Sequence, residues 1–358
     1  MTALVWHSSF VALTGYSGSS RAFVLGLDGR GVAVRPHFLY GADHDEQPAD
    51  RLPLRIRQLQ QQPLRLDLPQ VVYAPGDQIA KNSGRYRIGF TMLEVDRLPT
   101  AWVEQCNQMD EIWTPTAWGA EVFAASGVRR PVYAVPLGVD LARFRPGPRR
   151  ERLAERTVFL SVFEWGPRKG WDVLLRAYRA AFQPSDPVLL LLKIDCRVPA
   201  VNPAHELAAL LPAPAPPVGL IYNQPLSVAQ LVELYQGADC FVLPTHGEGW
   251  CMPALEAMAC GVPPIVTDWS GPTAFIDDTV GYPLRITGLV PTGQPHPYYR
   301  DAAWAAPDEA ALVELLRRVH HAPAEARAKG RAAAEAARRW GWEPAVQTVI
   351  DRLATIDD

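Results

Sequence analysis

The stretch FVLPTHGEGWCMPALEAMACG, residues 241–261, indicates the fold more clearly than any other part of the chain. It follows on a short apolar run at 240–244, which suits a buried strand and is too short for a helix. A loop at 245–252 then contains Gly-Glu-Gly. The residues after Pro253 favour a helix, and Gly261 suits its end. The stretch therefore predicts a strand, a glycine-containing loop and a helix in succession.

This order of elements directs free backbone N–H groups and the positive end of a helix dipole toward an anion. Two carboxylates lie within it, Glu248 in the loop and Glu256 in the first turn of the helix, with seven residues between them. Each has an ordinary interpretation, because Gly-Glu-Gly is a common turn and an early glutamate complements the helix dipole. Together, and in this order, they are far more specific.

The arrangement EGWCMPALE followed by AMACG resembles the signature of glycosyltransferase family 4. Members of that family have the GT-B fold and use sugar nucleotides with retention of configuration at the anomeric carbon. The resemblance covers nearly the whole chain and is strongest at 159–178 and 240–271. It implies an α/β protein with two doubly wound, Rossmann-like parallel-sheet domains that face each other across a cleft. The alternation of expected strands and helices agrees with this fold class.

Length and composition support a globular protein of two domains. The chain has 358 residues, of which 48% are hydrophobic, so a sizeable core is available. A net charge of −3 gives no sign of nucleic acid or an acidic membrane as an obligatory partner. The five cysteines lack metal-ligand spacing, and we expect reduced thiols in a cytoplasmic protein. The N-terminal residues do not resemble a signal peptide, and no apolar run reaches the roughly 20 residues of a membrane span.

The expected domain boundary lies within the Pro-Gly-Pro-Arg-Arg sequence at 146–150, the best linker by composition. The first domain is predicted at 1–147, completed by a C-terminal helix at about 341–358 as the resemblance implies. The second domain is predicted at 148–340. By the resemblance, the first domain binds the acceptor and the second binds the sugar nucleotide.

In the first domain, Gly15 and Gly18 are expected to flank a tight turn after the first strand. Their spacing is not the dinucleotide fingerprint, and a plain strand-to-helix connection is the simplest interpretation. By the resemblance, Gly15 and Tyr16 approach the donor, although Ser17 replaces a second glycine. Strands are predicted at 3–6, 31–40, 69–74, 86–91, 110–113 and 133–136.

Acidic residues of the first domain offer two further candidates. Glu94 falls just past the fourth strand, and the resemblance implies contact with the transferred sugar or the acceptor. Asp43 and Asp45 are one residue apart and could bind a divalent metal ion, as in the other large class of glycosyltransferases. Their polar neighbours and the lack of a nearby phosphate-binding loop favour a solvated loop instead. We therefore expect no metal ion and no other cofactor.

In the second domain, the loop EWGPRKG follows a strand at 158–163 and carries Arg168 and Lys169. Two cations after a strand suit a diphosphate, although an Arg-Lys pair is commonly just solvated. The resemblance favours the diphosphate. It also implies another basic residue near Glu164, which has the opposite charge. Either Arg168 supplies that charge or phosphate binding is weakened.

The resemblance assigns roles to the residues of the central stretch. Glu256 would hold both ribose hydroxyls, and Glu248 would hold a sugar hydroxyl or the anomeric region. The backbone at Cys251 and Met252 would bind further hydroxyls, with Cys251 in place of the usual glycine. These roles would place the donor along the loop and the start of its helix.

The expected reaction builds negative charge on a departing diphosphate. Arg168, Lys169 and the N–H groups around Trp250 would stabilise this charge without a metal ion. The turn at Ser270 and Gly271 is expected to line the donor cleft.

The remaining elements of the second domain are predicted from periodicity and composition. Residues 283–300 are expected to form a long irregular loop, and 198–218 a variable loop with one short helix. Ser227 is expected to cap a helix. Strands are predicted at 188–194, 219–222 and 262–267, and helices from about 171 and at 227–236, 307–319, 325–339 and 340–353.

The resemblance thus implies a hexosyltransferase-type enzyme of polysaccharide or glycoconjugate biosynthesis. The acceptor would be a glycan, a glycolipid or a small molecule, with no nucleic acid partner. The base of the nucleotide (UDP, GDP or ADP), the sugar, the acceptor and the oligomeric state stay open. Peripheral association with the inner face of a membrane also stays open, because some relatives use lipid acceptors.

Two other functions are compatible with a doubly wound fold. A dehydrogenase would need the dinucleotide glycine spacing, which follows none of the expected strands. A non-catalytic protein that binds sugar nucleotides or glycans is the second alternative, and Glu164 and Cys251 motivate it. Binding without hydrolysis or transfer would favour that alternative.

Overall fold

The computed structural model describes residues 3–12, 14–40, 52–148 and 155–356. The chain divides into two compact units. Unit 1 comprises Met1–Gly138, Gly293–Ala302 and Trp340–Asp358, and unit 2 comprises Val139–Thr292 and Ala303–Arg339. The division falls at Gly138, whereas the sequence analysis placed the boundary after residue 147. The Asp43-His44-Asp45 sequence lies outside the described residues.

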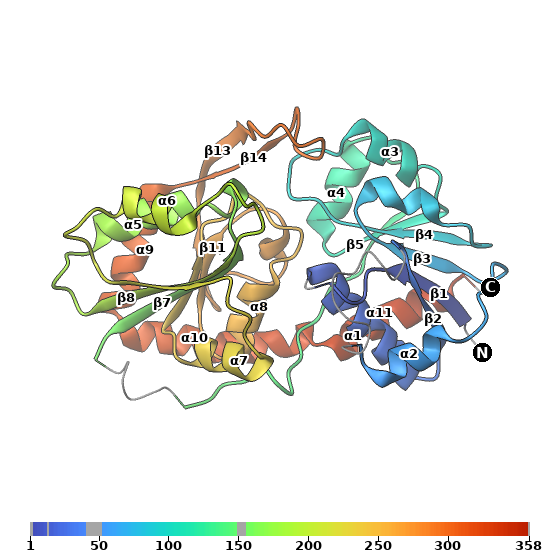
Figure 1. Ribbon diagram of the computed structural model, residues 1–358, viewed down its shortest axis with the longest axis horizontal. Coiled ribbons are helices and arrows are strands. Elements are labelled where there is room, and N and C mark those ends of the chain that lie inside the picture. Colours follow the sequence, from blue (N-terminus) through green and yellow to red (C-terminus); the bar gives the residue numbers. More distant parts are fainter. Residues whose placement is uncertain (1–2, 13, 41–51, 149–154, 357–358) are drawn as a thin grey trace. The chain divides into compact units, whose positions relative to one another are not determined.

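Unit 1 is built on a six-stranded parallel sheet with the order β2-β1-β3-β4-β5-β6 (Figure 1). Every strand predicted for this half is confirmed to within a few residues. The inner strands β3 and β5 are buried along their whole length, as expected for parallel strands covered on both faces. The strands are β1 Ala3–Ser8, β2 Ala33–Phe38, β3 Gln70–Tyr73, β4 Arg87–Phe90, β5 Glu111–Thr114 and β6 Val132–Ala134.

The prediction of a tight turn between Gly15 and Gly18 is wrong. Both glycines belong to the first turns of α1, Gly15–Gly29. Thr14 caps this helix, because its side chain accepts a hydrogen bond from the Ser17 N–H. The cap starts the helix at the glycines themselves. The other helices of unit 1 are α2 Leu54–Gln60, η3 Gly76–Lys81, α3 Thr100–Cys106, α4 Ala117–Ala125 and α11 Trp342–Ala354.

The C-terminal helix α11 packs against α1 within unit 1. A Cβ atom on Gly26 would lie 2.5 Å from the Val346 side chain, so the two helices approach closely only at a glycine. The ring of Trp342 meets that of Phe23 edge-on, with centroids 5.3 Å apart. The last segment of the chain therefore completes the core of the unit that contains its first strand.

Unit 2 contains a second six-stranded parallel sheet, with the order β12-β11-β10-β7-β8-β9. Strand order changes direction between β7 and β10, and such a switch point is where open α/β sheets bind ligands. The central strands β10 and β11 are fully buried. The strands are β7 Thr157–Glu164, β8 Val188–Asp195, β9 Val218–Tyr222, β10 Cys240–Leu243, β11 Pro264–Thr267 and β12 Tyr282–Leu284.

Helices cover the second sheet, as the sequence predicts (Figure 1). The Ser227 cap of α7 is confirmed, and Gln230 returns the hydrogen bond in a capping box. The helix of the central stretch, α8, begins at Met252 with proline in its first turn. The helices are η5 Pro167–Lys169, α5 Trp171–Ala181, α6 Pro203–Leu210, α7 Val228–Gln236, α8 Met252–Ala259, η6 Gly271–Ala274, α9 Glu309–His321 and α10 Pro323–Ala337.

The prediction of an irregular loop at 283–300 is wrong over much of its length. Part of it completes β12, and β13, Ile286–Pro291, pairs antiparallel with β14, Ala303–Pro307. The apolar residues of β13 do not alternate with polar ones, because Leu289 and Val290 are consecutive, and both are exposed. The segment therefore lacks the pattern by which a half-buried strand is found. The segment Gly293–Ala302, which joins β13 and β14, is counted with unit 1.

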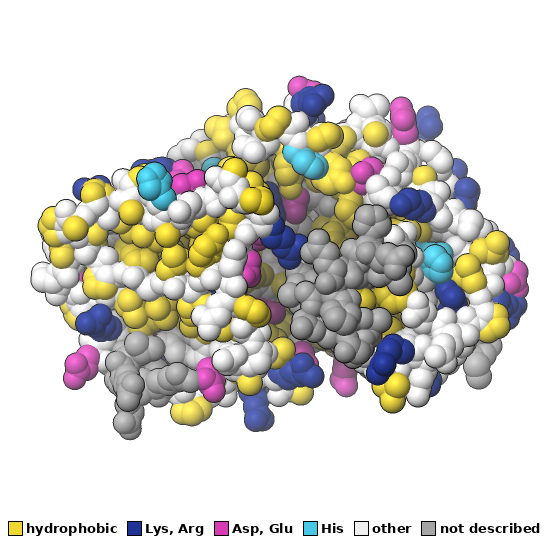
Figure 2. All heavy atoms as spheres, in the orientation of Figure 1, with side chains coloured by type: hydrophobic (Ala, Val, Ile, Leu, Met, Phe, Trp, Pro, Cys, Tyr) yellow, Lys and Arg dark blue, Asp and Glu magenta, His cyan; other side chains and the backbone are white. Residues whose placement is uncertain are grey.

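The surface carries charges of both signs. Figure 2 shows Lys and Arg side chains interspersed with Asp and Glu over the face in view, in keeping with a net charge of −3. No helix among the described residues combines the length and the apolar character that crossing a membrane requires.

Candidate active site

The loop after β7 lies directly against the end of β10. Gly170, between η5 and α5, has a φ of 62°. A Cβ atom at this position would lie 1.9 Å from the carbonyl oxygen of Pro244, so a side chain is excluded here. The glycine thus brings the Arg168-Lys169 pair to the loop that follows β10, at the switch point of the second sheet.

These two cations converge on one carboxylate. Lys169 Nζ lies 2.6 Å from Glu248 Oε1, and Arg168 Nη1 lies 3.1 Å from the same oxygen. Arg168 Nη1 also donates a hydrogen bond to the Gly247 carbonyl at 2.5 Å. The Thr245 hydroxyl donates to Glu248 Oε1 at 3.0 Å. The structure therefore brings together three residues that the sequence analysis proposed separately.

Charge and burial oppose each other at Glu248. Its side chain is only 8% exposed, and burial alone would raise the pKa of the carboxyl group. Lys169, then Arg168 and the hydrogen bond from Thr245, lower the pKa, and the net shift is downward. Glu248 is therefore ionised at neutral pH. Two cations around one carboxylate leave an excess of positive charge, which favours a further anion.

The loop that follows β11 fixes the backbone around Glu248. The Glu248 N–H donates to the Ser270 hydroxyl at 3.0 Å, and the Gly271 N–H donates to the Glu248 carbonyl at 2.9 Å. A Cβ atom on Gly271 would lie 2.7 Å from that carbonyl oxygen. Ser270 and Gly271, predicted to line the donor cleft, thus hold the glutamate loop in place.

Cys251 occupies the N-cap of α8 in the left-handed region, with φ of 79° and ψ of 60°. Glycine adopts this conformation readily, whereas other residues carry a strain of about 1–2 kcal/mol. The side chain makes no capping hydrogen bond, so the first N–H groups of α8 near Met252 lack that partner. Trp250, just before, is buried and packs against the ring of Phe275. The backbone that the resemblance assigns to the donor is thus held in a strained, buried turn.

Glu256 on α8 has a partner that the sequence analysis missed. The hydroxyl of Tyr235, on α7, donates a hydrogen bond to Glu256 Oε2 at 2.8 Å, and Tyr235 is fully buried. Burial raises the pKa of Glu256 to about 7, and the hydrogen bond from Tyr235 opposes this rise. Glu256 therefore holds its proton more readily than an exposed glutamate does. The sequence shows Tyr235 on a helix but does not show where its hydroxyl points.

Glu164, the residue with the unexpected charge, lies at the end of β7 and is exposed. Its Oε1 lies 3.8 Å from Arg197 Nε, on the loop after β8. A cation from a neighbouring strand end therefore stands beside the position where the resemblance implies one. The sequence analysis did not single out Arg197, because the sequence does not show how β7 and β8 pair. The pairing places Glu164 opposite Asp195, close to Arg197.

The first-half candidates lie together in unit 1. Gly15 is the exposed first residue of α1, and the ring of Tyr16 packs at 4.7 Å from that of Tyr73. Glu94 accepts a hydrogen bond from the Tyr299 hydroxyl at 3.2 Å. Burial raises the pKa of Tyr16, and Tyr73 and Glu94 raise it further. The candidate residues thus form two groups, one in each unit.

Groups of three or more His, Cys, Asp or Glu side chains that could hold a metal ion do not occur among the described residues.

Residues 148–293 match the family described as Glycosyl transferases group 1. The chain is 32% identical over 220 residues to D-inositol 3-phosphate glycosyltransferase of Segniliparus rotundus, covering 58% of this chain and 43% of the relative. It is 32% identical over 233 residues to the enzyme of that name from Kineococcus radiotolerans, covering 62% and 51%. The chain thus spans about half the length of the curated relatives it matches.

Solved structures resemble the chain over its full length. Sucrose-phosphate synthase from Thermosynechococcus elongatus has a TM-score of 0.73 at 15% identity, with 99% of both chains covered. Anabaena HepE, solved with UDP and glucose, has a TM-score of 0.70 at 12% identity, with 99% of this chain and 100% of that chain covered. At such identity the likeness shows the fold. The chain therefore has the GT-B fold, and residues 148–293 match the glycosyl transferases group 1 family.

Proposed function

We propose that this protein is a glycosyltransferase that moves a hexose from a nucleoside-diphosphate sugar to an acceptor hydroxyl. The observation that carries the proposal is the convergence of Lys169 and Arg168 on Glu248 at the switch point of the second sheet. The match of residues 148–293 to glycosyl transferases group 1 supports it.

Lys169 and Arg168 would bind the diphosphate of the donor. When the bond between the anomeric carbon and the phosphate oxygen breaks, negative charge grows on the leaving diphosphate. Fixed cations in a partly buried site stabilise this charge more than they stabilise the ground state. The diphosphate would take over part of the contact that Glu248 now makes, and Glu248 would then accept a hydrogen bond from a sugar hydroxyl.

The N-terminus of α8 would contribute to the same pocket. The N–H groups near Met252 point from a helix end, where the dipole favours negative charge. Glu256, one turn farther along α8, would accept hydrogen bonds from the ribose hydroxyls. Tyr235 occupies its Oε2, which leaves Oε1 and the second lone pair of Oε2 for the ribose.

Transfer would proceed without a metal ion, because the two cations supply the charge that a metal would otherwise supply. Retention of configuration rests on the similarity to glycosyltransferase family 4. The acceptor would bind to unit 1 beside Tyr16 and Glu94, where a carboxylate and tyrosine hydroxyls can hydrogen-bond a sugar or another polyol. UDP is the first nucleotide to test, since the Anabaena structure contains it.

Calorimetric titration with UDP, GDP and ADP tests the donor site. We expect one of the three nucleotides to bind. The Glu256→Ala variant should bind this nucleotide about ten-fold or more weakly, because charge-assisted hydrogen bonds to the carboxylate are lost. Lys329→Ala, in the same unit but outside the candidate site, should bind as the unchanged protein does. If the Glu256→Ala variant binds the nucleotide as tightly as the unchanged protein, Glu256 does not belong to the donor site.

Transfer itself is tested with the matching nucleotide sugars and a panel of glycan, glycolipid and polyol acceptors. We expect acceptor-dependent release of the nucleoside diphosphate, a rate that EDTA leaves unchanged, and retained anomeric configuration in the product by NMR. Binding of the donor with neither transfer nor hydrolysis over the whole panel would instead support a non-catalytic binding protein.

A further inference from the structure

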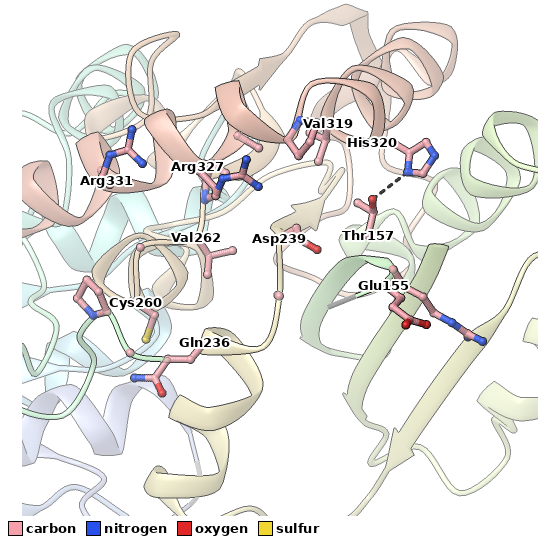
Figure 3. A pocket seen from close by; sticks show the side chains of 18 of the residues that line it. Glu155, Thr157, Gln236, Asp239, Cys260, Val262, Val319, His320, Arg327 and Arg331 are labelled. Atoms are coloured by element: carbon pink, nitrogen blue, oxygen red, sulfur yellow. Dashed lines mark hydrogen bonds between the residues drawn. The ribbon is translucent and has the colours of Figure 1, made fainter. Parts of the chain in front are cut away.

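Unit 2 contains a cavity of about 510 Å³ at the opposite edge of its sheet from the candidate active site (Figure 3). Its lining includes Thr157, the first residue of β7, and Pro187, Asp239 and Pro263, which immediately precede β8, β10 and β11. The candidate active site follows the carboxyl ends of β7 and β10. Because β7 has eight residues, at roughly 3.3 Å each, the two edges are roughly 26 Å apart. The cavity is therefore a separate place on the unit.

One wall of this cavity is positively charged. Arg327 and Arg331 lie one turn apart on α10, line the cavity and are exposed. Figure 3 shows both side chains extending from this helix. Within the part of the chain that the structure describes, neither side chain forms an ion pair or a hydrogen bond. Two guanidinium groups at this spacing suit a phosphate group, which each can bind through paired N–H donors.

The ionisable residues around the arginines do not cancel their charge. The ring of His320 is held by Thr157, with 2.8 Å between Nδ1 and Oγ1, and burial lowers its pKa, so it is neutral at pH 7. Asp239 uses Oδ2 to accept the Val158 N–H at 2.8 Å. Glu155 lies at the far end of the cavity from Arg331 (Figure 3). Arg156, beside Glu155, is a further cation of the lining. The cavity therefore has two cations on α10 and residues of both signs near the start of β7.

The size and the remaining walls indicate a ligand larger than a free phosphate ion. A volume of about 510 Å³ is in the range of small-molecule sites, roughly 300–1,000 Å³. The lining combines apolar groups of Pro187, Val262 and Val319 with hydrogen-bonding groups such as the Gln236 amide. A sugar ring presents C–H groups on its faces and hydroxyls at its edges, so it can satisfy both kinds of wall.

We propose that this cavity is a second binding site that takes a phosphorylated sugar, with its phosphate on Arg327 and Arg331. The sugar ring lies between α10 and the start of β7, with its hydroxyls toward Gln236 and Asp239. The site is independent of the proposed transfer reaction, because none of its residues belongs to the candidate active site.

Calorimetric titration of the full chain with glucose 6-phosphate, glucose and inorganic phosphate tests this proposal. We expect glucose 6-phosphate to bind at least about ten-fold more tightly than phosphate, and glucose not to bind. Arg327→Gln and Arg331→Gln should each weaken glucose 6-phosphate about ten-fold or more. Arg339→Gln removes an exposed charge outside the cavity and should leave the affinity unchanged.

The variant Lys169→Ala separates this site from the donor pocket. We expect it to keep its affinity for glucose 6-phosphate, and hydrogen exchange to show protection at 319–331 rather than at 245–256. Loss of binding in Lys169→Ala, with binding kept in both arginine variants, would place the ligand in the donor pocket and overturn the proposal. Equal affinities for phosphate and glucose 6-phosphate, or no binding of either, would overturn it as well.

Discussion

Glu111 in unit 1 and Glu248 in unit 2 are both buried carboxylates held by cations, but they occupy opposite places on their sheets. Glu111 is the first residue of β5 and is fully buried. Arg352 of α11 binds it with Nη2 2.6 Å from Oε2, and Trp113 and Tyr86 donate further hydrogen bonds. Glu248 lies on the loop after β10, where Lys169 and Arg168 bind it.

The difference separates a structural role from a functional one. The partners of Glu111 are Trp113 in the same strand, Tyr86 directly before β4, and Arg352 in α11. The contact with Arg352 holds α11 against the sheet. The partners of Glu248 come from the loop across the switch point, with side chains 14% and 21% exposed. Arg352 is as exposed as Arg168, at 21%, but its carboxylate is completely buried at the start of a strand. Glu248 is 8% exposed and follows the carboxyl end of β10 at the switch point, where open α/β sheets bind ligands, so its cations are placed to meet a second anion.

Replacing Lys169 should have the largest effect on activity. Lys169→Ala removes one of two cations that would stabilise the leaving diphosphate, and we expect turnover to fall about 100-fold or more. Stability should change less than in the Arg352→Ala variant described next, because Arg168 and Thr245 still contact Glu248. Steady-state rates and urea unfolding measure the two effects.

The control for this experiment is Lys329→Ala, which removes a lysine from the same unit without touching the candidate site. Unchanged turnover in the Lys169→Ala variant would contradict a functional role for the cations around Glu248.

Replacing Arg352 should have the largest effect on stability. Arg352→Ala leaves the buried Glu111 carboxylate without its cation, at a cost of about 3 kcal/mol in the free energy of unfolding. Arg87→Ala is the matched control, because Arg87 pairs with Asp110 at 3.4 Å on the surface of the same unit. That exposed pair should contribute less than about 1 kcal/mol. Equal losses in the two variants would contradict a structural role for Glu111.

Acid should destabilise unit 1 through His7. This buried ring hydrogen-bonds Gln70 at 2.9 Å, and burial, then His37, lower its pKa from 6.5 to about 4. Between these values the unfolded chain binds more protons than the folded one, so stability is lost as pH falls from 6.5 to about 4. The loss would reach about 3 kcal/mol. Urea unfolding at several pH values measures it.

His7→Gln should reduce this dependence on pH, since a glutamine does not titrate. His205→Gln, on the exposed surface of unit 2, is the control and should leave the pH dependence as it is. Parallel curves for the unchanged protein and His7→Gln would mean that another group governs acid stability.

The smallest predicted effect concerns Tyr235. The pKa of Glu256 is about 7, so binding that needs the carboxylate should strengthen as pH rises through 7. Tyr235→Phe removes the hydrogen bond that lowers this pKa, and the midpoint of nucleotide binding should move about one pH unit upward. Titration from pH 6 to 9, with the exposed Tyr222→Phe as control, checks this shift. If the pH midpoint of nucleotide binding stays the same in Tyr235→Phe, Tyr235 does not influence the donor site.

The sequence predicted local elements better than contacts between them. The strands of both sheets, the start of α8 and the Ser227 cap depend on neighbouring residues, and the structure confirms them. Two local predictions are wrong. The Thr14 cap turned an expected glycine turn into the start of α1, and the exposed strand β13 has no apolar pattern to identify it.

The candidate site could be predicted in its residue types but not in its pairing. Arg168, Lys169 and Glu248 were each expected to contact the donor, and their contact with one another was not foreseen. Tyr235 and Arg197 were missed because their importance depends on where the ends of distant helices and strands come together.

The sequence by itself determined the order of strands, loops and helices, and it determined which chemical groups lie at the ends of β7 and β10. Periodicity, helix capping and the placement of glycines depend only on residues that are close together in the chain. Only the tertiary structure decided that Lys169 meets a carboxylate 79 residues away and that Arg352 meets one 241 residues away. The physical reason is that such contacts form only when whole helices and strands pack together, and this packing brings side chains that are far apart in the chain to the same place.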